Sequence, residues 1–278
     1  MKYLGVSLSL FVSLNMAAQI IENKEPAILE IQYIKTTVSD TVKNRSRSDP
    51  MTLRVGKTAA MFYPTKMMWN DSLLQTNYAA YEEIYHKMNP TGQTTFNPPG
   101  GFEREYLFRN ITDGETMVYE KCGGFPYSYT EQTEHPVWEL GTGTKNVLGY
   151  ACQSATCNFR GRVWNVWFSP DIPINEGPWK LFGLPGLVLE ASDNKNQYVY
   201  KAVGLSTHNL QPVGIRLYTR DKPTKLKSRQ AYLQLMFRNY IKGDFAVTMS
   251  ALHSNASSNG RSDAQYDFQE RDYPHTSK

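Results

Sequence analysis

The stretch RVWNVWF at residues 162–168 decides the fold class, because its side chains follow a two-residue period. Successive side chains of an extended strand point to opposite faces of a sheet. The stretch therefore predicts a strand with one apolar face toward a core and one mixed face toward a different environment. The apolar face carries Trp164, Val166 and Phe168, and the mixed face carries Val163, Asn165 and Trp167.

Similar stretches lie on both sides of this one, and turn residues separate them. Runs rich in branched and aromatic residues, bounded by Gly, Asn and Asp, are typical of strands joined by hairpins. The pattern predicts a long antiparallel meander. Strands are expected at residues 28–36, 51–56, 59–63, 104–110, 115–121, 136–140, 146–159, 162–169, 187–192 and 198–206. Turns are expected at residues 112–114, 141–143, 160–161 and 193–196, and the basic patch at 43–50 is interpreted as a solvated hairpin tip.

Two helices are expected beside the strands. Ser72 followed by Gln75 matches a capping box, and apolar side chains then recur every three or four residues until Pro90 ends the pattern. A second helix is expected at about residues 227–242, ended by Gly243. We interpret the first helix as packed on the sheet, with a ligand-facing aromatic wall as the alternative. Its apolar face is Leu74, Tyr78, Tyr81, Tyr85 and Met88, and that of the second is Leu233, Met236, Phe237 and Tyr240.

These elements predict an α+β protein that is mainly antiparallel β. We expect a single curved sheet or half-open barrel with one or two helices packed on it, similar in architecture to the LolA-like periplasmic lipoprotein carriers. No repeat and no linker divides the chain, so one β-rich domain is expected at residues 19–253, followed by a polar tail at residues 254–278.

The charge balance and the N-terminus narrow the function classes. The chain of 278 residues carries 30 Lys and Arg against 26 Asp and Glu, a net charge of +4, which is too small to indicate a nucleic-acid partner. Residues 1–18 combine Lys2, an apolar run and the small residues Ala17 and Ala18, the pattern of a secretory signal peptide. No later apolar stretch reaches the ~20 residues that span a bilayer. A periplasmic or secreted protein that does not span the membrane is therefore expected.

The three cysteines are too few for a disulfide scaffold. Exported proteins tend to oxidise spare thiols, and Cys152 and Cys157 lie five residues apart on one predicted strand, where odd spacing points them to opposite faces. We expect Cys122 to form a disulfide with one of these two cysteines. Three buried, reduced thiols are the alternative.

No motif of a known catalytic class occurs in the sequence. The five histidines stand singly, without metal-ligand spacing, so no metal and no cofactor are expected. Glu103 and Glu105 share a predicted strand face, which we interpret as a solvated edge. We expect no catalytic residue, although an enzyme whose site is assembled only in space stays open.

The most distinctive stretch is GPWKLFGLPGLV at residues 177–188. Its prolines fix the backbone and remove hydrogen-bond donors, while its glycines permit tight turns, so the stretch predicts a rigid apolar loop that runs into a strand. The loop either plugs the open end of a curved sheet or forms the lip of a ligand groove, where cations would meet an anionic group. In the second case Trp179 and Phe182 lie at the rim. The candidate binding residues are Arg162, Trp179, Lys180, Phe182, Leu184 and Pro185.

Together with GYAC at 149–152, FRGR at 159–162 and WFSPDIP at 167–173, this stretch closely resembles the GLPGLI family of exported proteins, known chiefly from Bacteroidota. Val188 stands where the family motif ends in isoleucine, and YDFQE at residues 266–270 does not match the Asn-Pro-Ile-Glu ending of family members. The resemblance implies export, but the family brings no settled biochemical activity.

We therefore expect an exported GLPGLI family protein that is a non-enzymatic periplasmic binding or carrier protein. Its ligand would be hydrophobic or amphipathic, such as a lipid or a peptide. The alternatives are an envelope hydrolase or peptidase-like enzyme, and an accessory of an outer-membrane receptor with an envelope protein as its partner.

Overall fold

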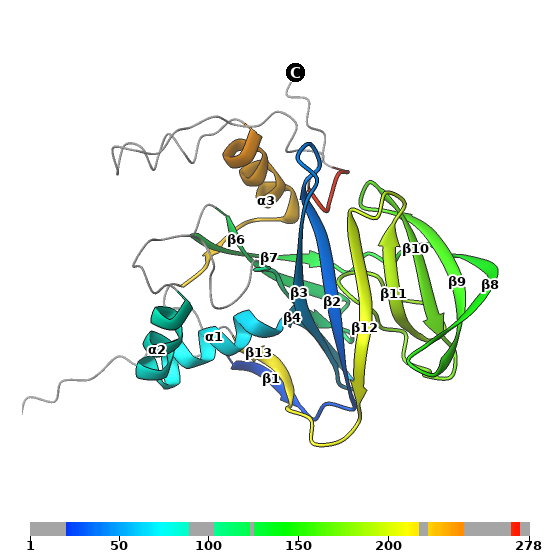
Figure 1. The fold of residues 1–278 in the computed structure, drawn as a ribbon, viewed down its shortest axis with the longest axis horizontal. Coiled ribbons are helices and arrows are strands. Elements are labelled where there is room, and N and C mark those ends of the chain that lie inside the picture. The colour runs from blue at the N-terminus through cyan, green and yellow to red at the C-terminus, as the bar shows by residue number, and fades with distance from the viewer. Residues whose placement is uncertain (1–20, 89–102, 123–124, 217–221, 242–267, 273–278) are drawn as a thin grey trace, which may run out of the picture.

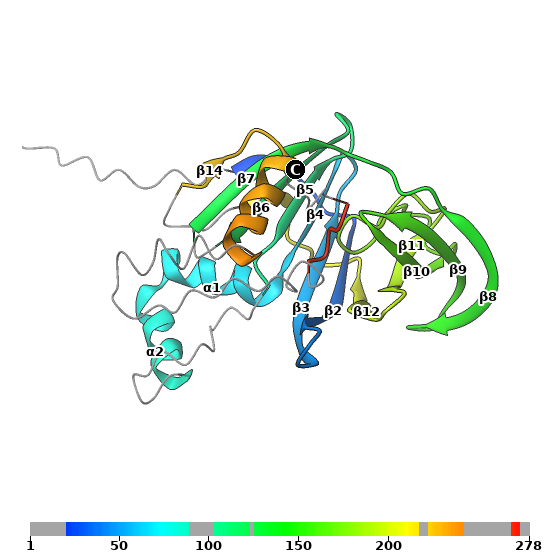
Figure 2. The ribbon, with the colours of Figure 1, turned by 90° about the horizontal axis from the view of Figure 1, so that it is seen from above.

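A computed structural model describes residues 21–88, 103–122, 125–216, 222–241 and 268–272. Twelve strands form one large sheet in the order β14-β7-β6-β5-β4-β3-β2-β12-β11-β10-β9-β8 (Figure 1). All neighbours in this sheet are antiparallel except β14, which runs parallel to β7. The sheet curves strongly toward its β8 end (Figure 2). The predicted class, α+β with one curved and mainly antiparallel sheet, is confirmed.

The strands are β1 (Ile21–Glu25), β2 (Leu29–Asp40), β3 (Arg45–Val55), β4 (Ala59–Pro64), β5 (Tyr106–Asn110), β6 (Glu115–Cys122), β7 (Phe125–Gln132), β8 (Glu139–Val147), β9 (Tyr150–Phe159), β10 (Arg162–Ser169), β11 (Leu187–Asp193), β12 (Tyr198–Ser206), β13 (Val213–Arg216) and β14 (Thr224–Lys225). The helices are α1 (Thr65–Thr76), α2 (Tyr78–Met88) and α3 (Arg229–Met236), and α3 continues into a π-helical turn at Phe237–Ile241. Strands β1 and β13 pair separately as a two-stranded sheet.

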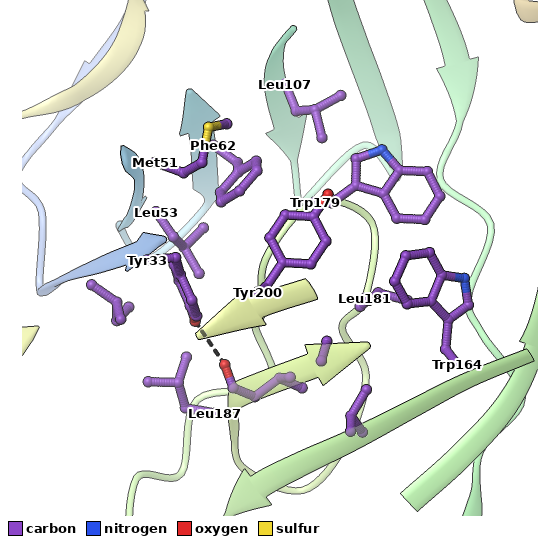
Figure 3. Close-up of a cluster of buried hydrophobic side chains, with 14 of the residues drawn as sticks. Tyr33, Met51, Leu53, Phe62, Leu107, Trp164, Trp179, Leu181, Leu187 and Tyr200 are labelled. Carbon is purple, nitrogen blue, oxygen red and sulfur yellow. Dashed lines mark hydrogen bonds between the residues drawn. The ribbon is translucent and has the colours of Figure 1, made fainter. Parts of the chain in front are cut away.

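One face of the large sheet carries the main core, and we call it the concave face. Alternation along β10 buries Trp164, Val166 and Phe168 on this face, as the sequence predicts. Tyr33 of β2 lies under the same core and donates a hydrogen bond from Oη to the Val188 carbonyl oxygen at 2.7 Å (Figure 3). The bond satisfies a hydroxyl that would otherwise be buried without a partner.

The other face is covered by a smaller cluster built around α1. Met67 of α1 packs with Met61, Tyr106 and Tyr119, and α1 contacts β3 and β4. Helix α3 lies instead against β7 on the face of the main core, to which it contributes Tyr232 and Leu233 (Figure 1). The two helical regions thus cover different faces of one sheet.

The prediction of one long helix from Ser72 is wrong. The chain forms α1 from Thr65 and then a separate helix α2 from Tyr78, with Asn77 between them. Ser72 lies inside α1 and does not cap it. The predicted packing on the sheet also fails for α2, which buries none of its described side chains.

Helix α3 begins close to the predicted position. The Ser228 side chain accepts a hydrogen bond from the Ala231 backbone N–H, which caps the helix. Of the expected inward face, Leu233 is buried and Tyr240 is exposed, while Tyr232 is buried in addition. Gly243 lies outside the described residues.

Several predicted strands and turns differ from the structure. The stretch 146–159 is a hairpin and not one strand, because Leu148 and Gly149 adopt positive φ and turn the chain from β8 into β9. The expected turn at 141–143 lies within β8, at an irregularity in its pairing. Strand β7 was not predicted, and β3 starts within the patch expected to be a hairpin tip. In the described part of the chain, no helix is long and apolar enough to cross a membrane.

Candidate binding site on the concave face

The proline–glycine loop, residues 177–186, is part of the core. Trp179 is 2% exposed and packs between Phe159 and Trp164, at ring-centroid distances of 5.9 and 5.5 Å. Phe182 is 5% exposed and stacks under the Arg109 guanidinium at 3.7 Å. The expected rim position of these two aromatics is therefore wrong, and the loop is a plug. Leu184 is buried as well, and Pro185 is exposed.

Two glycines explain the composition of this loop. A Cβ on Gly177 would lie 2.0 Å from the Leu181 carbonyl oxygen, and a Cβ on Gly186 would lie 2.2 Å from the Ser169 carbonyl oxygen. No side chain fits at either position without moving backbone atoms. The backbone of the loop therefore lies so close to its neighbours that only glycine fits at these two positions.

Arg162 and Lys180, the two cations expected to meet an anionic ligand, are neutralised by the protein itself. Arg162 donates to Asp193 Oδ2 at 2.7 Å and lies over the Tyr198 ring at 4.6 Å. Lys180 Nζ contacts Glu131 Oε1 at 2.5 Å and Glu270 Oε1 at 2.7 Å. Neither cation is positioned to bind a ligand anion, so this candidate role is not supported by their contacts.

A short C-terminal segment, residues 268–272, closes over these cations. Arg162 donates to the Gln269 carbonyl oxygen at 2.8 Å, and Gln269 in turn donates to the Tyr200 hydroxyl at 2.9 Å. Glu270 pairs with Lys180 and with Arg229 of α3. The expected polar tail is thus docked on the concave face at these five residues. In Figure 2 it lies as a short red segment beside β3.

Beyond this network, two carboxyl groups face each other on neighbouring strands. Tyr106, the first residue of β5, pairs with Tyr119 of β6, and one further step in the same register brings Glu105, which precedes β5, to the level of Glu120. Glu105 and Glu120 are both half-buried. Among the described residues, neither carboxyl forms an ion pair. We call Glu105 and Glu120 the carboxyl pair.

Lys35 and Glu103 border the carboxyl pair. These two side chains form a buried ion pair between β2 and the residues that precede β5. The Lys35 ammonium also lies 5.7 Å from the Tyr198 ring centroid and 5.8 Å from that of Tyr200. Lys35 is therefore already engaged by an anion and two aromatic faces.

Tyrosines line the other side of the carboxyl pair. Tyr129 of β7 and Tyr232 of α3 stack with ring centroids 5.4 Å apart. Tyr232 is 6% exposed, and its hydroxyl has no hydrogen-bond partner among the described residues. Buried hydroxyls are normally paired, so this hydroxyl is available for a further hydrogen bond.

The carboxyl groups of this region titrate differently. Burial opposes ionisation of Glu103, but the Lys35 and Arg47 charges outweigh it and lower the pKa of Glu103 to about 2. Burial raises the pKa of Glu105 to about 7, against the opposing effect of Lys180 and Lys35. Burial, and then the Glu105 charge, raise the pKa of Glu120 well above its usual value. Near neutral pH, the carboxyl pair therefore holds a proton.

The expected disulfide is not formed. All three cysteines are free and buried, and seven strands lie between β6, which carries Cys122, and β9, which carries the other two cysteines. Cys122 Sγ instead accepts a hydrogen bond from Asn239 Nδ2 at 3.0 Å. The alternative of three buried thiols describes the structure.

Sequence reasoning identified Glu103 and Glu105 but interpreted them as a solvated edge, which is wrong. Their alternate spacing was the correct signal for a shared face. Their partners Lys35, Glu120 and Tyr232 come from three other elements, and no local pattern connects them. Pairing of β5 with β6 was the step that would have placed Glu120 opposite Glu105.

Comparisons with known proteins give a partial match. The family model "N-glycanase peptide, N-terminal domain" matches residues 128–221. Two crystal forms of PNGF-II are similar at 15% and 14% identity, each with a TM-score of 0.47, over 76% and 77% of this chain. The chain spans about one third of those structures, 33% and 34% of their length. No curated protein matches. The family match includes Lys180, and it begins after Glu105 and Glu120, the residues that form the carboxyl pair.

Proposed function

We propose that the protein is an exported binding protein of the GLPGLI type, which holds a polar or amphipathic ligand at the carboxyl pair. The observation that carries this proposal is the pair itself: two half-buried carboxyls opposite each other, without a cation of their own among the described residues. An uncompensated buried charge is costly, so such groups persist mainly where a function requires them.

The surroundings of the pair support binding because they are rigid. Lys35 with Glu103, and Lys180 with Glu131 and Glu270, connect β2, β7, the proline–glycine loop and the C-terminal segment around it. A site that is ordered before the ligand arrives loses little conformational entropy on binding. The apolar body of an amphipathic ligand would meet Tyr129 and Tyr232, since the apolar side chains of the loop are already packed in the core.

Export remains part of the proposal. Residues 1–18 would be removed as a leader, and the domain at 19–253 would act in the periplasm or outside the cell. N-terminal sequencing of the protein recovered from the periplasm or medium should find a start near Gln19. A start at Met1 would contradict this part of the proposal.

Native mass spectrometry tests the binding function. The wild-type protein and the Glu120→Gln variant are purified from the periplasm of the same expression host or the native organism. We expect the wild type to carry an additional mass that Glu120→Gln lacks. Glu115→Gln is the matched control, because Glu115 lies on the same strand and is exposed. The proposal fails if the wild type carries no ligand, or if the mass stays with Glu120→Gln.

A hydrolase is the second candidate function. At pH 5–6 Glu103 is ionised and Glu105 is largely protonated, since their pKa values are about 2 and about 7. Such a division gives a general acid, Glu105, beside an ionised carboxylate, Glu103, which is too weak a base to take up a proton and would act on the substrate only through its charge. The name of the matching family model suggests an N-glycosylated peptide as the substrate to try. Release of glycan or peptide by the wild type, reduced about 100-fold or more in Glu105→Gln, would support hydrolysis. Absence of product would favour binding.

A further inference from the structure

We infer that the ligand of the carboxyl pair is an organic cation, an amine whose ammonium group lies between Glu105 and Glu120 and whose apolar body contacts Tyr129 and Tyr232. This inference rests on the proposed binding function and specifies the chemical class of its ligand. It depends on three observations: the opposition of the two carboxyls, the engagement of the nearby lysines, and the unpaired Tyr232 hydroxyl.

The opposition of Glu105 and Glu120 is unfavourable unless something lies between them. Residues directly opposite on antiparallel strands have Cβ atoms about 4.5–5.5 Å apart, and like charges in that position destabilise a sheet. The register of β5 with β6 brings the two carboxyls to the same level, because Tyr106, next to Glu105, pairs with Tyr119, next to Glu120. A proton or a cation shared by the two carboxyls removes the repulsion.

The protein's own cations nearby are already engaged. Lys35 pairs with Glu103, and Lys180 pairs with Glu131 and Glu270. Moving Lys35 to the carboxyl pair would take from Glu103 the one cation that it ion-pairs with among the described residues, which is unfavourable. Lys180 is already shared by Glu131 and Glu270, although both of these also pair with Arg229. A further cation at the carboxyl pair would therefore come from a ligand.

Tyr232 gives an independent indication of a missing ligand. Its ring is buried against Tyr129, while its hydroxyl lacks a partner among the described residues. The register of β6 with β7 pairs Val118 with Tyr129 and Glu120 with Tyr127, so Tyr129, on which Tyr232 stacks, lies diagonally across from Glu120. Burial, and then the Glu120 charge, raise the pKa of Tyr232. Two stacked aromatic rings next to carboxylates form an environment that favours ammonium groups through cation–π attraction.

An organic amine fits these residues better than a metal ion. Among the described residues, no group of three or more His, Cys, Asp and Glu is arranged to hold a metal. Ca²⁺ takes six to eight oxygen ligands, more than two carboxyls and a phenol provide. An ammonium group needs only a few acceptors and gains from the aromatic rings.

Binding of an amine should depend on pH through the carboxyl pair. The charged groups that act on Glu105 are Lys35 of β2, Glu103, which precedes β5, Lys180 of the loop and Glu270 of the C-terminal segment. Tyr129, Tyr232 and Cys122 face it from β7, α3 and β6. At low pH a proton occupies the pair and competes with the ammonium. Affinity should therefore rise as the pH rises through about 7, the pKa of Glu105.

The test uses benzylamine as the probe and benzyl alcohol as its neutral counterpart, in calorimetric titrations of the purified full chain. We expect benzylamine to bind at pH 8 and to bind at least tenfold more weakly at pH 5.5. Glu105→Gln and Glu120→Gln should each weaken binding at least tenfold, and Tyr232→Phe severalfold. Glu115→Gln, exposed on the same strand, should bind as the wild type does. Circular dichroism and melting curves verify that each variant is folded.

Several outcomes would overturn the inference. They are equal binding of benzyl alcohol, unchanged binding in Glu120→Gln, or displacement of benzylamine by calcium chloride at equimolar concentration. No binding of benzylamine together with a neutral or anionic ligand found by native mass spectrometry would refute the amine and leave the binding function in place. No binding of benzylamine and no co-purified ligand would refute both, and would leave the pair as a carboxyl dyad that shares one proton.

Discussion

The proline–glycine loop and the carboxyl pair lie on the same face of the sheet, but they balance their charges in different ways. In the loop region, Lys180 and Arg162 are both matched by carboxylates of the protein. In the carboxyl pair, Glu105 and Glu120 have no matching cation among the described residues. Charged side chains that pair with each other stabilise the fold, whereas carboxyls without a matching cation are available to bind a ligand. The most distinctive part of the sequence is thus not the part best suited to bind.

Removing the central aromatic side chain of the loop should have the largest effect on stability. Trp179→Ala should lower the free energy of unfolding by about 3–5 kcal/mol, because it leaves a cavity among Phe159, Trp164 and their neighbours. Denaturant unfolding followed by circular dichroism measures the change. A loss below about 1 kcal/mol would mean that the ring is not part of the core.

Removing the cation of the loop should have the next largest effect. Lys180→Met leaves Glu131 and Glu270 without the ammonium between them, which should cost about 3 kcal/mol. Lys225→Met is the matched control, since Lys225 is exposed and forms no ion pair among the described residues. Urea unfolding of both variants gives the values. Equal stability of the two variants would show that the network contributes nothing.

The pH dependence of stability should separate the two regions. Glu105 has a pKa of about 7 when folded, above its value of about 4.3 when unfolded, so its contribution is fully present below pH 4 and is lost as the pH rises toward 7. Glu103 and Glu270 have folded values of about 2, so their contribution is present above pH 5 and is lost as the pH falls toward 2.

Stability should therefore be highest near pH 5 and fall by about 2 kcal/mol between pH 5 and pH 8. Melting temperatures measured in this range without ligand test the prediction. A stability that increases steadily from pH 5 to pH 8 would contradict the surplus charge of the pair.

Neutralising one carboxyl should have the smallest effect, and its sign is opposite to that of the loop variants. Glu120→Gln should raise the free energy of unfolding by about 1 kcal/mol at pH 8, because it removes a like-charge contact, and should have little effect at pH 5. Glu115→Gln should change stability by less than about 0.5 kcal/mol at either pH. Destabilisation by Glu120→Gln at pH 8 would mean that the carboxylate has an internal partner.

Local patterns predicted most of the sheet correctly. The alternation at residues 162–168 and the turns at Gly114 and Gly161, both with positive φ, lie where the sequence indicates. Patterns failed where conformation depended on distant contacts. The tyrosines of α2 repeat at helical spacing and stack on one another, with centroids 6.0 and 6.2 Å apart, although the helix buries none of its described side chains. Periodicity reports a shared face, and it does not report what that face contacts.

The candidate site was harder to predict because its charges pair across long sequence separations. Lys35 meets Glu103, and Lys180 meets Glu270, through contacts that only the sheet order and the docked C-terminal segment create. A sequence of charged residues on strands looks the same whether the strand end is solvated or covered. Only the position of β5 between β4 and β6, with α3 lying over β7, decides that Glu105 is covered.

The docking of residues 268–272 has a consequence for the order of events during synthesis. Glu270, which pairs with Lys180, follows it by 90 residues in the sequence. Gln269, whose carbonyl oxygen accepts a hydrogen bond from Arg162, follows Arg162 by 107 residues. Until those residues have emerged, Lys180 has Glu131 and Arg162 has Asp193, but the remaining N–H groups of both cations must stay hydrated or be buried without acceptors. The second choice is unfavourable, so the concave face of the emerging chain stays hydrated. Completion of the fold is thereby tied to the arrival of one short segment.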